Sequence, residues 1–323
     1  MILRQTIILA VLALVLAACG DGQIQEANKS EDRSSEKPRI ALIMKSLANE
    51  FFVSMAAGAR DHNEKNTDAY ELIVNGIKTE SDLAQQVALV DQMISAQVDA
   101  IVIAPADSKA LVPALSRADQ ASIIVINIDN RLEPSILKDY GLNIPFIGPS
   151  NREGAEMIGR FALQNLEAGT EIAVLEGIPS AFNSIERREG FKQAARKEKM
   201  DVVTVQSGDW DQTKAAQVTA GILSQFPNLG AILAANDNMA IGAASAIGMA
   251  GQTGKITVAG FDNIDAIHQL ILDNRVIGTV DQFGDQLAVF GIEYAIEALT
   301  TGQSQQDKQT PLELITKETL ENG

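Results

Sequence analysis

The sequence has few of the residue types that disulfides, metal sites and nucleic-acid surfaces require. It contains a single cysteine, so no disulfide can form within the chain. Its two histidines, His62 and His268, lie far apart with no cysteine beside either, which argues against a His/Cys metal site. The 26 Lys and Arg residues are outnumbered by 42 Asp and Glu. Because phosphate binding needs clustered basic residues, this net charge of −16 argues against nucleic acid as a partner.

The motifs of several enzyme classes are also missing. The chain has no Gly-x-x-x-x-Gly-Lys-Ser/Thr phosphate loop, no Gly-x-Gly-x-x-Gly after the first apolar run and no Gly-x-Ser-x-Gly nucleophile elbow. Asp129 and Asp262 could in principle act as a general acid and base. Nothing in the sequence places a nucleophile or a metal beside them, so a binding protein without catalytic residues or cofactor is favoured over an enzyme.

The apolar run at the N-terminus, Ile7 to Leu16, is too short for a comfortable membrane span. With Arg4 before it, the run fits the core of a signal peptide over residues 1–18. The ending Leu-Ala-Ala-Cys resembles the bacterial lipoprotein signal, which predicts cleavage before Cys19 and lipidation of its thiol. The alternative is a plain secretory signal with an incidental cysteine. Either reading predicts a periplasmic or cell-surface protein, and a lipid anchor would attach it to a membrane.

Residues 19–37 are polar, with almost no large apolar side chain, so we expect a flexible tether there. The length of 323 residues is enough for two domains of ordinary size. A composition of 46% hydrophobic and 21% charged residues is typical of a globular protein with an ample core. From Arg39 onward, short apolar runs such as Ala100–Ala104 alternate with helical spacings. This alternation restarts after a Pro/Gly/Asn-rich loop around Gly141–Asn151. The pattern predicts two α/β lobes with parallel sheets that are covered on both faces.

Polar residues follow several of the predicted strands. In an open α/β sheet, ligands bind just beyond the carboxyl ends of the strands, which is where Asn236 and Asp237 follow Ala231–Ala234. The alternative is that one of them merely caps the next helix. Asp129 and Asp262 also follow apolar runs, and each precedes an asparagine. Such pairs are common in turns, but two matched pairs favour carboxylates that approach one cleft from opposite lobes.

Aromatic residues make up 4% of the chain, and three of them are placed unusually. Phe51 and Phe52 are adjacent at a strand-to-helix junction, where only one can easily point into the core. Trp210, the only tryptophan, lies between Asp209 and Asp211 in a polar loop. A sugar ring, with apolar C–H faces and a rim of hydroxyls, suits a slot between flat rings with charged groups around it. Core packing remains the alternative for each ring.

Three segments resemble the periplasmic sugar-binding proteins of the ribose/allose/galactose group. They are Lys45–Val53, Ala234–Gly242 and Val258–Asp262, and the resemblance extends from about Arg39 to Thr316. It implies two Rossmann-like lobes with parallel sheets, joined by three hinge crossovers, and a pyranose sugar held between them. The N-terminal lobe would comprise residues 38–148 plus 283–312. The C-terminal lobe would comprise residues 149–282 plus 313–323.

The resemblance also implies roles for individual residues. Side chains expected to bind the sugar by hydrogen bonds or stacking are Asn49, Phe51, Phe52, Asp129, Asn130, Arg187, Trp210, Asn236 and Asp262, with Gln282 at a hinge crossing. Lys45 looks like the lysine of the allose-binding subgroup, whereas Asn130 matches neither the arginine of ribose binders nor the glutamate of allose binders. With Asn236 as a ligand contact, Asp237 becomes the expected helix cap.

The charges of these residues bear on the class of sugar. Lys45 and Arg187 balance Asp129 and Asp262, which favours a neutral sugar or cyclitol over sugar acids or phosphates. The resemblance implies hinge closure near residues 148–151, 281–283 and 312–313, followed by docking on an ABC permease with its ATPase. A sensor that passes its closed form to a chemoreceptor would use the same cleft. A repressor would need an N-terminal helix-turn-helix, and a hydrolase would have to turn over a glycoside.

Overall fold

The computed structural model describes residues 37–303 and 306–322. The predicted signal peptide (1–18), the lipidation site Cys19 and all of the predicted tether except Lys37 lie outside the described residues. Within the described part of the chain, no helix combines the length and the apolar character needed to cross a membrane.

The first sheet has six strands in the order β11-β5-β4-β3-β1-β2, and all of its pairings are parallel. Its strands are β1 (Arg39–Ser46), β2 (Glu71–Ile77), β3 (Ala100–Ile103), β4 (Ile124–Ile128), β5 (Phe146–Gly148) and β11 (Lys308–Gln309). The helices of this lobe are α1 (Glu50–Lys65), α2 (Leu83–Ser95), α3 (Val112–Gln120), α4 (Pro134–Asp139) and α10 (Gly284–Thr301).

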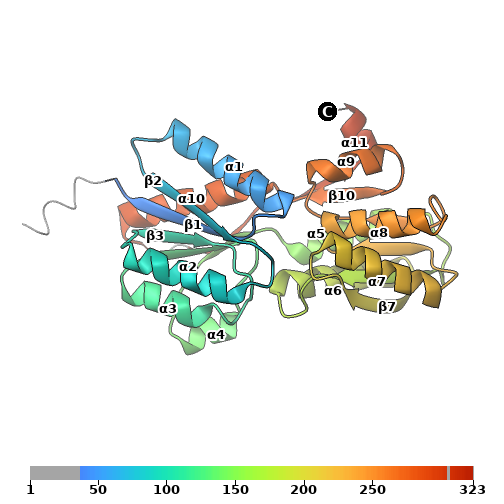
Figure 1. Cartoon of the computed structure of the whole chain (residues 1–323), viewed down its shortest axis with the longest axis horizontal. Helices are drawn as coiled ribbons and strands as arrows, with labels where there is room; N and C mark the ends of the chain where they lie inside the picture. Colours follow the sequence, from blue (N-terminus) through green and yellow to red (C-terminus); the bar gives the residue numbers. More distant parts are fainter. Residues whose placement is uncertain (1–36, 304–305, 323) are drawn as a thin grey trace, which may run out of the picture. The chain divides into compact units, whose positions relative to one another are not determined.

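Helices cover both faces of this sheet, with α1 and α10 on one side and α2 and α3 on the other (Figure 1). Successive side chains of a strand point to opposite faces. Leu42 of β1 therefore belongs to the core with α1 and α10, whereas its neighbour Ile43 belongs to a separate core with α2 and α3. A strand that is buried on both faces needs a continuous apolar sequence, and such apolar runs predict the strands of this sheet.

The second sheet also has six strands, in the order β12-β10-β9-β8-β6-β7. Its strands are β6 (Glu171–Glu176), β7 (Asp201–Ser207), β8 (Ala231–Ala234), β9 (Thr257–Ala259), β10 (Gly278–Asp281) and β12 (Glu313–Thr316). Its helices are α5 (Asn151–Leu163), α6 (Phe182–Lys197), α7 (Gln212–Gln225), α8 (Asp237–Met249), α9 (Asp265–Leu272) and α11 (Lys317–Asn322). The edge strand β12 runs antiparallel to β10, and the other pairings are parallel.

The chain passes between the two sheets three times, at residues 149–150, 282–283 and 310–312. At the second crossing Phe283 has a φ of 54°, and α10 then packs back against α1 and β4 of the first lobe. The predicted fold class, two parallel-sheet α/β lobes joined by three crossovers, is confirmed. The carboxyl ends of β1 and β4 in one lobe, and of β8 and β9 in the other, supply several of the residues described next.

Candidate functional site

Asn49 and the two phenylalanines form one wall of the site at the start of α1. Asn49 is the N-cap residue, and its Oδ1 accepts a hydrogen bond from Phe51 N at 3.1 Å. Its Nδ2 remains as a donor and bonds to Glu80 Oε1 at 3.3 Å; an aspartate could cap the helix but would offer no donor. The rings of Phe51 and Phe52 are edge to face, with centroids 5.1 Å apart, and both are buried. Both therefore pack in the core as well as bordering the site.

Lys45, at the carboxyl end of β1, is surrounded by acidic and aromatic groups. Its Nζ lies 3.0 Å from Asp129 Oδ2 and 3.9 Å from Glu80 Oε2. The same nitrogen is 5.3 Å from the ring centroid of Phe52 and 5.7 Å from that of Trp210. Burial by itself lowers the pKa of Lys45, but Asp129 and Glu80 outweigh it and the pKa is raised. The buried ammonium group therefore stays charged.

Arg187 of α6 is the matching cation in the second lobe. Its Nε donates to Asn151 Oδ1 at 2.7 Å, and its Nη1 donates to Ala235 O at 2.8 Å and Asp262 Oδ1 at 3.2 Å. The guanidinium carbon lies 3.8 Å from the ring centroid of Phe261. The Arg187 side chain is only 2% exposed. Stacking and three hydrogen bonds hold it in one orientation.

Asp262 follows β9 with a φ of 124°, a conformation that costs an L-residue backbone strain. Its Oδ1 also accepts a hydrogen bond from Gln282 Nε2 at 2.7 Å. Burial raises the pKa of Asp262 to about 8, and Arg187 acts in the opposite direction. Gln282 thus lies behind Asp262 and holds it in place.

Trp210 lies in the loop between β7 and α7, where Asp209 and Trp210 both have positive φ, 50° and 65°. Ser207 Oγ lies 2.6 Å from Gly177 O and 2.5 Å from Asp209 Oδ1, which ties this loop to the end of β6. A Cβ on Gly177 would overlap the indole of Trp210. The missing side chain of Gly177 therefore lets the ring lie against the backbone, where it is 5% exposed.

Asn236, and not Asp237, caps α8. Asn236 has extended backbone angles, and its Oδ1 accepts a hydrogen bond from Met239 N at 2.9 Å. The expectation that Asp237 is the cap is wrong, because its carboxylate points into the interior. There it accepts hydrogen bonds from Ile264 N at 3.0 Å and Thr279 Oγ1 at 2.7 Å. Burial raises the pKa of Asp237 to about 6.

These side chains surround one small cavity between the two lobes. Its lining residues are Lys45, Asn49, Phe51, Phe52, Glu80, Asp129, Asn183, Arg187, Trp210, Asn236 and Asp262. Nine of the eleven residues expected from the sequence are among them, whereas Asn130 and Gln282 are not. The cavity volume is about 20 Å³, which is room for about one water molecule.

Asn130 connects the lobes instead of facing the cavity. Its Nδ2 donates to Pro105 O at 2.9 Å, and its Oδ1 accepts from Ser108 Oγ at 3.3 Å. The same Oδ1 accepts from Asn183 N of the second lobe at 3.2 Å. Ser108 Oγ also accepts from Phe182 N at 2.9 Å. Loops of the two lobes are thus hydrogen-bonded directly to each other beside the cavity.

Two lining residues, Glu80 and Asn183, were not expected from the sequence. Glu80 follows β2, so the rule about carboxyl ends of strands applies to it as well. Asn183 lies one helical turn before Arg187, on the same face of α6. Glu80 makes three carboxyl groups against two cations, one more than the balance drawn from the sequence. Among the described residues, no cluster of His, Cys, Asp and Glu could hold a metal ion.

Three buried oxygens at this cavity lack a hydrogen bond: Glu80 Oε2, Asp129 Oδ2 and Asn183 Oδ1. Asp129 Oδ2 has the Lys45 ammonium group nearby, but without hydrogen-bond geometry. Burying an acceptor without a partner costs about 1–3 kcal/mol, so such atoms are rare in stable folds. Because all three are acceptors, a ligand that donates several hydrogen bonds would satisfy them.

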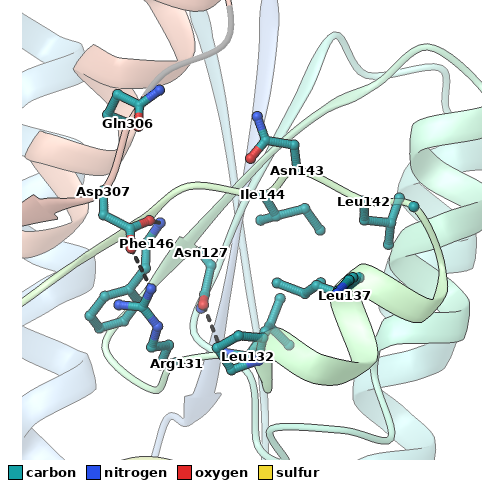
Figure 2. Close-up of a pocket in the computed structure, with 13 residues that line it drawn as sticks. Asn127, Arg131, Leu132, Leu137, Leu142, Asn143, Ile144, Phe146, Gln306 and Asp307 are labelled. Atoms are coloured by element: carbon teal, nitrogen blue, oxygen red, sulfur yellow. Dashed lines mark hydrogen bonds and ion pairs between the residues drawn. The ribbon is translucent and has the colours of Figure 1, made fainter.

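A much larger cavity, of about 590 Å³, lies beside α4 in the first lobe (Figure 2). Its polar groups are bonded to one another: Arg131 pairs with Asp307, and Phe146 N donates to Asp307 Oδ1 at 2.8 Å. Leu132 N donates to Asn127 Oδ1 at 2.8 Å, as Figure 2 shows. Among the described residues that line it, none has a buried side-chain polar atom without a hydrogen bond. Nothing in its chemistry requires a ligand.

Known proteins are similar to this chain in both fold and sequence. The family described as the periplasmic binding protein domain matches residues 40–304. The chain belongs to this family. A family member from Pseudomonas aeruginosa, named D-ribose/D-allose-binding protein, is 45% identical over 308 residues, which cover 94% of this chain and 96% of that protein.

Two solved structures of periplasmic binding proteins extend the comparison. An ABC transporter solute binding protein from Burkholderia multivorans, whose ligand is unknown, has a TM-score of 0.86 and 48% identity; the match covers 87% of this chain and all of that one (100%). An ABC transporter periplasmic solute binding protein from Actinobacillus succinogenes, with bound D-allose, has a TM-score of 0.83 and 33% identity, and the match covers 89% and 100%. The family expected from the sequence motifs is confirmed.

Proposed function

We propose that this chain is the substrate-binding protein of an ABC-type sugar importer and that it binds a neutral monosaccharide, a ribose- or allose-like pyranose, in the cavity between the lobes. The observation that carries the proposal is the set of buried acceptor oxygens without hydrogen bonds, placed among aromatic rings. The name of the Pseudomonas aeruginosa relative and the D-allose in the Actinobacillus succinogenes structure support this class of ligand.

In this proposal each side chain binds the sugar through hydrogen-bonding atoms or ring faces that its contacts within the protein leave available. Asp129 and Asn183 accept hydrogen bonds from sugar hydroxyls. Lys45 and Arg187 donate to sugar oxygens, as do the amide groups of the two capping asparagines, whose Oδ1 atoms are already used by the helices. The rings of Phe51 and Phe52 meet one face of the sugar, and that of Trp210 meets the other. Gln282 and Asn130 do not contact the sugar. Gln282 orients Asp262 through a hydrogen bond, and Asn130 accepts a hydrogen bond from Asn183 N of the second lobe.

Binding requires the lobes to separate and then close. A cavity of about 20 Å³ cannot admit a monosaccharide unless the lobes move, and the three crossings at 149–150, 282–283 and 310–312 are where a hinge motion would act. On closure the site excludes water, so each charged hydrogen bond acts in a lower dielectric. A ligand that lacks one hydroxyl then leaves a buried group unpaired, which costs about 1–3 kcal/mol.

The proposal includes secretion and attachment of the chain to a membrane through a lipid on Cys19. The closed form would dock on a permease; a receptor that recognises the same closed form would make the chain a sensor. Purifying the sugar-loaded protein from membranes, with the Cys19→Ser variant as control, would identify whichever membrane partner it holds. We expect release of the Cys19→Ser variant into the soluble fraction.

Isothermal titration calorimetry with D-ribose, D-allose, other aldopentoses and aldohexoses, and inositols tests the function directly. We expect micromolar or tighter binding of at least one of these ligands and none of the matching sugar phosphates or sugar acids. Absence of binding throughout the panel, at protein concentrations that detect micromolar affinity, would overturn the proposal.

A further inference from the structure

We propose that Glu80 is a specificity-determining residue of the cavity: its Oε2 accepts a hydrogen bond from one hydroxyl of the ligand, while its Oε1 and its charge hold Asn49 and Lys45 in position. This inference rests on the proposed function, because it names a contact within the same site.

The backbone around Glu80 is fixed at both ends. The residue lies between β2 and α2, and Asp82 two residues later is the N-cap of α2, accepting a hydrogen bond from Gln85 N at 3.2 Å. On the other side, Ser46 Oγ donates to Lys78 O at 3.0 Å, which joins this loop to the end of β1. Glu80 is therefore held over the cavity by two neighbouring elements of the first sheet.

The two carboxylate oxygens of Glu80 have different surroundings. Oε1 accepts from Asn49 Nδ2 at 3.3 Å. Oε2 is buried and has no hydrogen bond, because the nearest cation, Lys45 Nζ, is 3.9 Å away and lies closer to Asp129. The Glu80 side chain is only 11% exposed, so water does not compensate for the missing partner. One oxygen thus supports the site, and the other is left for a ligand.

A purely structural role would not require a second carboxyl oxygen without a hydrogen bond at the cavity. To orient Asn49, a neutral side-chain oxygen would be sufficient, and Lys45 already has Asp129 as its close partner. Burial raises the pKa of Glu80, while Lys45 and Asn49 act in the opposite direction. The third carboxyl group adds an acidic acceptor among the lining residues. It therefore favours ligands with a hydroxyl donor at this point and acts against ligands that bear a carboxylate or phosphate there.

The test uses Glu80→Gln in the full-length protein, because glutamine keeps the acceptor for Asn49 and replaces the charged oxygen with an amide. Wild type and variant are titrated with the sugar that binds best in the panel and with its monodeoxy derivatives, one for each hydroxyl. We expect one deoxy position to weaken wild-type binding about tenfold or more. In Glu80→Gln, the parent sugar should bind about tenfold more weakly and the penalty at that one position should fall below about threefold.

Glu64→Gln is the matched control, since it makes the same charge change at an exposed position of α1 and should leave every titration unchanged. Glu80→Asp keeps the charge but withdraws the oxygen by one methylene, and it serves if Glu80→Gln is poorly folded by circular dichroism. A deoxy-sugar profile that is unchanged in both variants would overturn the inference while leaving the proposed function intact. If wild type binds no sugar, the proposed function fails and the role of Glu80 fails with it.

Discussion

Two cavities of this molecule differ in a way that size does not predict. The cavity beside α4 is about 590 Å³, whereas the one lined by Lys45, Asp129 and Arg187 is about 20 Å³. Around the larger one, polar groups such as Arg131 and Asp307 bond to each other. Around the smaller one, five ionisable side chains are gathered and three buried acceptors lack hydrogen bonds. Because unpaired buried groups cost stability, they indicate a binding site more reliably than open volume does.

Backbone strain marks the same site. Asp129, Trp210 and Asp262, which line the small cavity, have φ values of 60°, 65° and 124°. Left-handed conformations are tolerated in Asp better than in most residues, but they are uncommon away from glycine. Strain of about 1–3 kcal/mol for such a residue persists only where surrounding contacts enforce it, and it is concentrated at functional sites. The large cavity has no such residue among its described non-glycine lining.

The largest effect should come from removing one carboxylate of the cleft. Asp129→Ala leaves Lys45 without its 3.0 Å partner, and Asp262→Ala leaves Arg187 without its carboxylate. Truncating one member of a buried pair of ionisable side chains costs about 2–5 kcal/mol of binding, so each variant should lose at least about 30-fold in sugar affinity by calorimetry. Circular dichroism should show that both variants remain folded. Normal binding by both would mean that the cleft is not the binding site.

A cleft with too few partners for its carboxyl groups should also make stability depend on pH. The pKa of Asp262 is raised from its ordinary value of 3.8 to about 8, and that of Asp237 to about 6. Between pH 4 and pH 8 the folded protein therefore keeps protons that the unfolded chain has lost, and the free energy of unfolding falls as the pH rises.

Urea unfolding of the ligand-free protein between pH 4.5 and pH 7.5 measures this dependence. We expect a total decrease of more than about 1.4 kcal/mol, which corresponds to one pKa unit. In Asp262→Asn the decrease should become smaller, because the contribution of Asp262 is removed and only Asp237, Glu80 and Asp281, whose pKa values burial also raises, remain to titrate in this way. A decrease that is the same in both proteins would show that Asp262 is ionised in the fold throughout this range.

Simple rules of sequence reading predict part of the cleft, whereas Lys45, Asn49 and Arg187 were expected only from the family resemblance. Carboxyl ends of parallel strands meet at one edge, which brought Asp129, Asn236 and Asp262 into consideration, and a scarce aromatic such as Trp210 is conspicuous in a polar loop. The rules fail between neighbours. At a φ of 60° for Asp129, the chain turns so that Asn130 bonds to the other lobe instead of facing the cavity. Sequence patterns do not contain that angle.

The same limit explains the two other differences. Asn236 and Asp237 are both good cap residues, and only the extended backbone of Asn236 decides that it is the cap. Glu80 lies in a polar segment, Lys-Thr-Glu-Ser-Asp, that resembles an ordinary solvated turn. Its burial depends on the β1–α1 loop, more than thirty residues away in the chain, as the hydrogen bond from Asn49 Nδ2 to Glu80 Oε1 shows. Long-range contacts of this kind cannot be predicted from a single sequence.

A smaller effect should come from a change that removes none of the side chains that line the cleft. In Gly177→Ala the new Cβ would displace the indole of Trp210. Losing the contact of one aromatic face costs about 0.5–1.5 kcal/mol, so sugar affinity should fall about threefold to tenfold. Trp210 is the only tryptophan, so its fluorescence reports on the cleft directly. We expect the emission of the variant to shift to longer wavelength. Unchanged emission and affinity would show that Trp210 is not held by Gly177.

The smallest effect is expected in the large cavity. Arg131 and Asp307 are 32% and 48% exposed, and an ion pair at this exposure contributes at most about 1 kcal/mol to stability. Arg131→Ala should therefore lower the midpoint of thermal unfolding slightly and change sugar affinity by less than about twofold. Arg131→Ala is a strict test of the difference between the two cavities. Its partner Asp307 immediately precedes β11, which leads into the third crossing between the lobes. A tenfold loss of affinity would mean that the large cavity is coupled to the cleft through β11. In that case, the presence of hydrogen-bonded polar groups around a cavity would not distinguish cavities that affect binding from those that do not.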